Sequence, residues 1–240
     1  MSTCKKNVIY ARSSEHMTEL PDGSIDFAFA DLPFGIGIGK RLQTRARGFR
    51  DESAAYEDPH INYVMMAHWF NEVYRVLKSE GSMVCFSGWN HLDDVLFAAK
   101  TEHFHIQGLC ILHYTTGMPT QKRYVSSHYH APWWTKHPAK WTFNKQVPWQ
   151  MDVWDVKREY CGKKYNHPCP TGVKWIEKFI SIHTNKGDVV LDFCMGVGGT
   201  AIACLNLGRN YVGYEINPIY VETAERRIAE WKSGGPGKPI

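Results

Sequence analysis

Three observations predict an α/β fold for this chain. Patterns typical of strands and helices alternate along most of the 240 residues. The run 25–30 has almost no polar break, as in a strand of a parallel sheet that is buried on both faces. A glycine-rich turn at 196–199 separates an apolar run from a helical pattern, as in sheets that bind a nucleotide-type cofactor.

The first half of the chain alternates short apolar runs with amphipathic segments. Residues 7–11 form a strand-like run, and a Pro-Asp-Gly turn separates it from strand 25–30. Residues 35–60 are rich in glycine and charge and carry little periodicity, which predicts a long loop. Residues 63–77 place their apolar side chains on one helical face. The remaining predicted elements here are strand 82–86, helix 93–100 and strand 104–114.

The second half begins with an irregular aromatic segment, residues 115–165, to which periodicity assigns no element. Helix 171–183 has apolar residues at helical spacing, and Gly208 closes the later helix 199–207. The other predicted elements are strands 188–193 and 211–216 and helix 218–231. Residues 1–232 are expected to form a single domain, with a catalytic half 1–114, a target-recognition segment 115–165 and a cofactor half 166–232; residues 233–240 are expected to be a disordered tail.

The cofactor half carries its polar residues at strand ends. Asp192 ends a predicted strand, and the glycines at 196 and 198 let the following backbone turn sharply and approach a ligand. The helix start then offers free amide donors. About twenty residues further on, Glu215 ends the next strand, where an acid accepts hydrogen bonds from ribose hydroxyls. This spacing fits S-adenosylmethionine or a dinucleotide, and a purely structural glycine turn is the third interpretation.

The segment Asp31-Leu32-Pro33-Phe34 follows the buried strand 25–30 directly. Functional side chains of open α/β sheets gather at such strand ends. Capping is the alternative, but Pro33 biases Leu32 away from helical angles, so the segment is a poor helix start. Asp31, Leu32, Pro33 and Phe34 are therefore predicted to be catalytic.

These four residues resemble the Asp-Pro-Pro-Tyr signature of the DNA amino-methyltransferases, which modify adenine N6 or cytosine N4. The resemblance extends over nearly the whole chain, through the segments 75–82, 126–128, 134–136, 166–170, 188–200 and 214–220. The catalytic motif precedes the glycine turn, which is the order of the family's beta class. Thr171-Gly172 stands where many members have Lys-Pro, so the cofactor contacts of that segment depart from the pattern.

The resemblance implies an S-adenosylmethionine-dependent methyltransferase fold. Such a fold is Rossmann-like and circularly permuted, with a mostly parallel seven-stranded sheet, one antiparallel strand and helices on both faces. The cofactor-binding residues it implies are Asp31, His167, Asp192, Phe193, Gly196, Gly198, Thr200, Glu215 and Asn217. His167 and Asn217 have helix capping or a wall of the pocket as equally good interpretations.

The implied reaction is methylation of an exocyclic amine in DNA. Asp31 and the carbonyl of Leu32 would each accept one amino hydrogen and stabilise the charge that develops on nitrogen. Phe34 would stack on a flipped base. An aspartate at the first motif position favours adenine N6, because cytosine N4 enzymes more often carry serine. Cytosine N4, an RNA substrate, a catalytically weakened binding homologue and a dinucleotide oxidoreductase are the alternatives.

Cations after the catalytic motif predict contacts to phosphate. The predicted nucleic-acid-binding residues are Lys40, Arg41, Arg45, Arg47, Arg50, Lys122 and Arg123. A solvated charged loop is the alternative for the first five. The segment 115–165 also mixes cations with tryptophans that could stack on bases or pack a compact subdomain.

Composition adds weaker constraints. The net charge of +4 is too small to indicate a polyanion partner by itself. Seven scattered cysteines favour reduced thiols in the cytoplasm, and neither a signal peptide nor a membrane span is expected. Cys161, His167 and Cys169 lack a second ligand pair, so no metal site is predicted. Double-stranded DNA is the expected partner, with a homodimer and a paired restriction enzyme as further possibilities.

Overall fold

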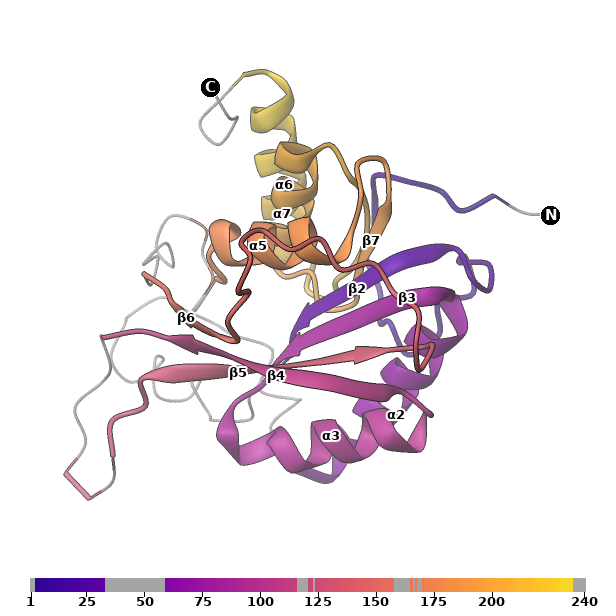
Figure 1. The fold of residues 1–240 in the computed structure, drawn as a ribbon. Coiled ribbons are helices and arrows are strands. Elements are labelled where there is room, and N and C mark those ends of the chain that lie inside the picture. Colours follow the sequence, from indigo (N-terminus) through magenta and orange to yellow (C-terminus); the bar gives the residue numbers. More distant parts are fainter. Residues whose placement is uncertain are drawn as a thin grey trace.

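The computed structural model describes residues 3–32, 59–115, 121–122, 124–157, 165, 167 and 170–234. These residues build one eight-stranded sheet in the order β1-β8-β7-β2-β3-β5-β4-β6 (Figure 1). The strands are β1 (Val8–Tyr10), β2 (Ile25–Asp31), β3 (Leu77–Phe86), β4 (His105–His113), β5 (His128–Thr135), β6 (Val153–Asp155), β7 (Val189–Asp192) and β8 (Asn210–Tyr214). Its first strand pairs with its last, β8, so the two ends of the fold meet at one edge of the sheet.

The sheet is mostly parallel, as predicted. Strand β5 runs antiparallel to both of its neighbours, β3 and β4, and every other pairing is parallel. The predicted count of seven strands is one too low, because β6 adds a three-residue strand beside β4. The segment 115–165 is therefore less irregular than its periodicity indicates, since it contains both β5 and β6.

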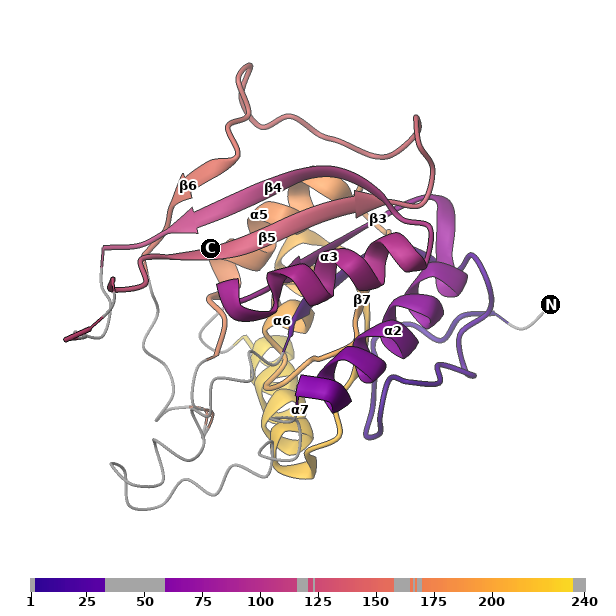
Figure 2. The ribbon, with the colours of Figure 1, turned by 90° about the horizontal axis from the view of Figure 1, so that it is seen from below.

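Helices cover both faces of the sheet, as predicted (Figures 1 and 2). One face carries α2 (Pro59–Val76), the short η2 (Trp89–His91) and α3 (Leu92–Thr101). The other carries α5 (Val173–His183), α6 (Gly199–Leu207) and α7 (Pro218–Lys232). Each helical layer closes a separate hydrophobic core against the sheet, with Phe70 and Trp134 fully buried in the first and Phe179 in the second.

The elements predicted from the sequence are confirmed, with shifted bounds. The largest shift is in β3, which begins at Leu77 rather than at residue 82. Residues 33–58 lie outside the described residues, and with them most of the predicted 35–60 loop. The same holds for residues 235–240 of the predicted tail. None of the described helices combines the length and apolar composition that crossing a membrane requires.

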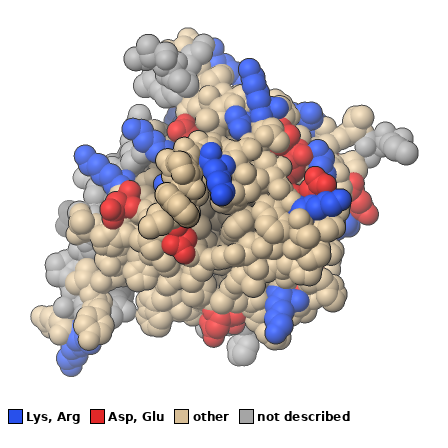
Figure 3. Space-filling model, viewed as in Figure 1, with Lys and Arg blue, Asp and Glu red and all other residues tan. Residues whose placement is uncertain are grey.

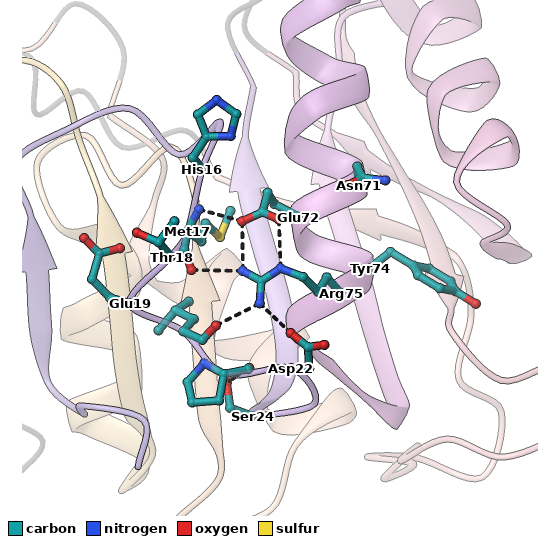
Figure 4. A network of polar contacts seen from close by, with 12 residues as sticks. His16, Met17, Thr18, Glu19, Asp22, Ser24, Asn71, Glu72, Tyr74 and Arg75 are labelled. Atoms are coloured by element: carbon teal, nitrogen blue, oxygen red, sulfur yellow. Dashed lines mark hydrogen bonds and ion pairs between the residues drawn. The ribbon is translucent and has the colours of Figure 1, made fainter. Parts of the chain in front are cut away.

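A polar network joins α2 to the turn that precedes β2 (Figure 4). The Arg75 guanidinium donates to both carboxylate oxygens of Glu72, to Asp22, and to the backbone carbonyls of Leu20 and Met17. The pKa of Glu72 is lowered, chiefly by the hydrogen bond from Arg75. The network is structural: it fixes the chain that leads into the catalytic strand.

Candidate active site

Asp31 of the predicted catalytic set and Asp192 of the predicted cofactor set meet because β2 and β7 are parallel neighbours. Phe29 pairs with Asp192 in this register, so the carboxyl ends of both strands reach the same edge of the sheet. A pocket lies there, with about 420 Å³ of empty space when the open solvent at its mouth is included. Its lining includes Asp31, Thr171, Asp192, Gly196, Thr200 and Arg227.

The glycine turn needs glycine for two separate reasons. Gly196 and Gly198 have φ angles of 51° and 79°, in the left-handed region that disfavours side chains. A Cβ on Gly198 would also lie 2.8 Å from the Cβ of Ala224 in α7. Gly196 lines the pocket, and a Cβ there would lie 3.6 Å from His167 Nε2. The turn thus packs closely on α7 on one side and leaves the pocket side open.

Asp192 braces this turn from within. Its Oδ2 accepts a hydrogen bond from Thr200 Oγ1 at 2.5 Å, and its Oδ1 accepts one from the backbone amide of Cys194 at 3.0 Å. The pKa of Asp192 is raised to about 7, because burial and, to a smaller extent, the charges of Asp31 and Glu215 outweigh the two hydrogen bonds that lower it. Asp192 and Thr200, both predicted cofactor residues, therefore hold each other and the loop.

Glu215 links the end of β8 to the same turn. One carboxylate oxygen accepts from the amide of Gly196 and the other from the amide of Asn217, both at 2.8 Å. These two hydrogen bonds tie the carboxylate to the glycine turn and to the start of α7. Asn217 caps α7 by accepting from the amide of Ile219 at 3.0 Å, which is the capping interpretation of this residue.

Asp31 is held differently. Its Oδ2 accepts a hydrogen bond from the hydroxyl of Thr171, the residue just before the cap of α5. Its Oδ1 is buried and has no hydrogen-bond partner among the described residues. Burial raises the pKa of Asp31 to about 6, although the hydrogen bond from Thr171 lowers it. One acceptor oxygen is thus left unpaired at a buried site, where an unsatisfied acceptor is costly.

Two predicted residues lie in the core rather than at the pocket. The side chain of Phe193 is 2% exposed and packs between Trp69 and Phe70. Only its backbone is therefore available to a cofactor, and its carbonyl already accepts from Ser14 Oγ at 2.8 Å. Leu32 is 3% exposed, and its amide donates to the carbonyl of Phe86. Pro33 and Phe34 lie outside the described residues.

The pocket also contains residues that the sequence did not single out as cofactor residues. Arg227 of α7 lines it, donates to the carbonyl of Val197 at 2.5 Å and lies 4.0 Å above the ring of Tyr165. The sequence signal that could have identified Arg227 is its position, because a charged residue there falls on the apolar face of the predicted helix 218–231. His167 forms part of the wall, as one of its two interpretations predicts, with its ring centroid 4.7 Å from that of Tyr220.

The predicted nucleic-acid contacts are mostly outside the described residues. This applies to Lys40, Arg41, Arg45, Arg47, Arg50 and Arg123. Lys122 is exposed. Lys136, a cation of the same segment, instead donates to the carbonyls of Tyr74 and Leu77 and is structural. On the face in Figure 3, the described Lys and Arg side chains are interspersed with Asp and Glu rather than gathered in one patch.

A metal is not needed to explain the described residues. Among them, no group of three or more His, Cys, Asp or Glu side chains is arranged to hold a metal ion. His167 is described, whereas Cys161 and Cys169 are not. The buried carboxylates of the pocket are instead accounted for by protein donors, except for the unpaired oxygen of Asp31.

The pocket fits a nucleoside that carries an amino-acid tail. Gly196 and Gly199, which carry no side chain, are among its lining residues, and the first turn of α6 supplies amide donors. The carboxylates of Asp31 and Asp192 supply acceptors, and Glu215, just after the neighbouring strand, holds the turn through the amide of Gly196. Apolar Phe29 and Ile176 complete the wall. Donors, acceptors and apolar surface are thus combined as a ligand with a sugar, a ring and a carboxylate requires.

Comparisons with known proteins agree with this geometry. The sequence profile of the DNA methylase family matches residues 25–226. The type II methyltransferase M.HpaI of Haemophilus parainfluenzae is 26% identical over 93% of this chain and 74% of its own length. The DNA adenine methyltransferase YhdJ of Escherichia coli (strain K12) is 25% identical, covering 93% of this chain and 82% of its own.

A solved structure extends the agreement to the fold and the cofactor. The crystal structure of the M1.HpyAVI–S-adenosylmethionine complex matches with a TM-score of 0.70 and 25% identity, over 92% of this chain and 98% of that chain. Residues 25–226 contain both the Asp31 segment and the glycine turn. The chain therefore belongs to the DNA methylase family of the adenine N6 and cytosine N4 type, whose members are S-adenosylmethionine-dependent DNA amino-methyltransferases.

Proposed function

We propose that this methyltransferase acts on the N6 amino group of adenine in DNA, with Asp31 as the residue that receives the amine. The observation that carries the role of Asp31 is its unpaired Oδ1, buried in the pocket that the glycine turn also lines, and the choice of adenine rests on two further points. An aspartate at this motif position favours adenine within the family. The relative YhdJ, by its name an adenine methyltransferase, supports the same choice.

The proposed role of Asp31 follows from the chemistry of an aromatic amine. Such a nitrogen is a weak nucleophile because its lone pair is conjugated with the ring. A hydrogen bond from the amine to Asp31 Oδ1 would draw the nitrogen toward tetrahedral geometry and free that lone pair. The ionised carboxylate would also stabilise the positive charge that develops on nitrogen. S-adenosylmethionine, when bound, supplies a methyl group that is already activated by its sulfonium.

The raised pKa of Asp31 adds a second role. The methylated nitrogen must lose one proton, and a carboxylate whose pKa is about 6 is a better acceptor for it than an ordinary aspartate. Asp31 can then pass this proton to water. The same raised pKa requires that the reaction slows as the pH falls through about 6, because the protonated acid no longer stabilises a cation.

The position of Asp31 supports base flipping. Its Oδ1 is buried and the residue lines the pocket, so an amino group inside a stacked duplex would not reach it. Extrusion of the target base brings the amine within hydrogen-bonding distance. Asp31, Leu32, Pro33 and Phe34 remain the proposed catalytic residues. The homodimer, the paired restriction enzyme and the cytoplasmic location remain predictions from the sequence.

The test identifies the methylated base directly. The purified chain is incubated with labelled S-adenosylmethionine and with genomic DNA from a host that lacks DNA methylation, and the DNA is then hydrolysed to nucleosides. We expect label in N6-methyldeoxyadenosine and none with the Asp31→Ala variant. Label in N4-methyldeoxycytidine would overturn the choice of adenine. A parallel reaction adds RNA in competition with the DNA. Preferential labelling of the RNA would overturn the choice of DNA.

A further inference from the structure

Thr171 connects the two halves of the active site. Its hydroxyl donates to Asp31 Oδ2 across 140 positions of sequence. Its backbone carbonyl lies 3.6 Å from the place that a Cβ on Gly199 would occupy, at the first turn of α6. Thr171 also lines the pocket itself. A single residue ahead of α5 therefore bonds to the Asp31 carboxylate and lies near the start of α6.

The hydrogen bond makes the two carboxylate oxygens of Asp31 unequal. Thr171 occupies Oδ2, while Oδ1 has no partner among the described residues. A carboxylate can rotate about its Cβ–Cγ bond, and a donor on one oxygen selects one rotation. The oxygen that is left over is then available to a substrate donor. Substrate positioning of this kind supplies a large part of the rate when no covalent step is involved.

We propose that Thr171 is a positioning residue of the methyl-transfer reaction: its hydroxyl fixes the Asp31 carboxylate so that Oδ1 receives the amino group. This inference rests on the proposed role of Asp31. Thr171-Gly172 stands where many family members carry Lys-Pro, so the sequence marked this pair as a departure without assigning it a function. A hydroxyl donor also favours the ionised form of the acid that it contacts.

A purely structural contact is the competing explanation, and the two explanations predict different pH profiles. If Thr171 acts on the carboxylate, its loss raises the pH below which the reaction slows. If Thr171 only joins α5 to the sheet, its loss lowers stability or cofactor affinity. The acid limb of the pH profile, where the rate falls at low pH, then stays unchanged. The other ionisable groups that line the pocket are His167, Asp192, Cys194 and Arg227, and none of them is altered by the test.

The test compares Thr171→Val, which removes the hydroxyl at nearly constant shape, with Thr171→Ser, which keeps it. Both are measured as full chains for kcat between pH 5 and 9, and for S-adenosylmethionine affinity by calorimetry. A hydrogen bond to a charged group predicts a kcat loss of roughly 10-fold for Thr171→Val near pH 6.5. The acid limb of Thr171→Val should move up by about 0.5–1 pH unit, because one hydrogen bond to a carboxylate lowers its pKa by about that much.

Thr171→Ser should retain the wild-type limb, and both variants should bind S-adenosylmethionine about as tightly as wild type. A wild-type acid limb in Thr171→Val, or a loss confined to cofactor affinity, would overturn the inference. Asp31→Asn is measured in parallel. If Asp31→Asn keeps its activity, the proposed function of Asp31 fails; if it is inactive and Thr171→Val keeps the wild-type profile, only the role of Thr171 fails.

Discussion

The glycine turn and the catalytic carboxylate lie in the same pocket but are built in opposite ways. In the turn, both oxygens of Asp192 and both oxygens of Glu215 accept hydrogen bonds from protein donors, and Arg227 donates to the carbonyl of Val197. At Asp31, one oxygen is bonded to Thr171, and the other has no partner among the described residues.

The difference separates preorganisation from reactivity. A loop whose polar groups are already satisfied keeps its shape without the ligand, so cofactor binding need not order it. A buried acceptor that is left unpaired costs stability in the ligand-free protein, and a substrate donor removes that cost. The cofactor site is thus finished by folding alone, whereas the catalytic site is completed by the target base.

The largest effect is expected when the Asp31 carboxylate is removed. Asp31→Ala deletes the acceptor without touching the glycine turn, and loss of one such stabilising group costs about 10²–10³-fold in kcat. We expect at least that loss in methyl transfer, with S-adenosylmethionine affinity unchanged within a few-fold. Calorimetry and single-turnover label transfer measure the two quantities. Equal loss of both would mean that Asp31 belongs to the cofactor cradle instead.

The second largest effect is expected from a substitution in the preformed glycine turn. Gly198→Ala places a side chain at a φ of 79° and 2.8 Å from Ala224 Cβ. Left-handed strain and overpacking together predict a loss of about 3 kcal/mol in unfolding free energy. Gly187→Ala is the matched control, because it has a φ of 89° and no atom within 4 Å of its added Cβ. Strain alone should cost that control about 1 kcal/mol. Similar losses in denaturant titrations of both variants would show that the contact with α7 is unimportant.

A smaller effect measures the cost of the buried carboxylate. The pKa of Asp31 rises from 3.8 to about 6, so the folded protein binds the proton more tightly than the unfolded chain. The contribution of this group to stability is full below pH 3.8 and is lost as the pH rises through about 6. Asp31→Asn should therefore be more stable than wild type by at most about 3 kcal/mol at pH 8. The gap should close near pH 4, and a gap independent of pH would contradict the unpaired, desolvated carboxylate.

The smallest expected effect concerns Glu215. Glu215→Gln keeps one acceptor oxygen but removes the charge, and a lost charged hydrogen bond predicts a roughly 10-fold weaker affinity for S-adenosylmethionine. Because Glu215 lies on the preformed side, kcat at saturating cofactor should stay near wild type. Calorimetry and saturation kinetics separate the two. A fall in kcat with unchanged affinity would place Glu215 with the reacting groups.

The parts of the site that the sequence predicts are those that strand ends determine. Asp31, Asp192 and Glu215 each follow a recognisable strand, and parallel packing brings strand ends to one edge. Thr171 and Arg227 were not recognised as site residues, because their contacts depend on how α5 and α7 dock against the glycine turn. The local sequence around these two residues carries no information about how the helices dock.

The fold follows the same division. Long elements such as α2 have enough periodicity to be predicted, whereas β6 has three residues and forms only because β4 offers it an edge. Asn217 shows the limit for single residues. Its place between a strand and a helix fits a cofactor contact and a helix cap equally, and the structure shows the cap.

The distance between the target amino nitrogen and Asp31 Oδ1 can be measured in a crystal of this chain. The crystal would contain a flipped-base duplex and a cofactor analogue that cannot transfer a methyl group. We expect the adenine amino nitrogen about 3 Å from Asp31 Oδ1, which is the length of an ordinary hydrogen bond. Thr171 should still donate to Oδ2. An amino nitrogen bound elsewhere in the pocket, with Oδ1 turned away from the base, would contradict the role assigned to Asp31.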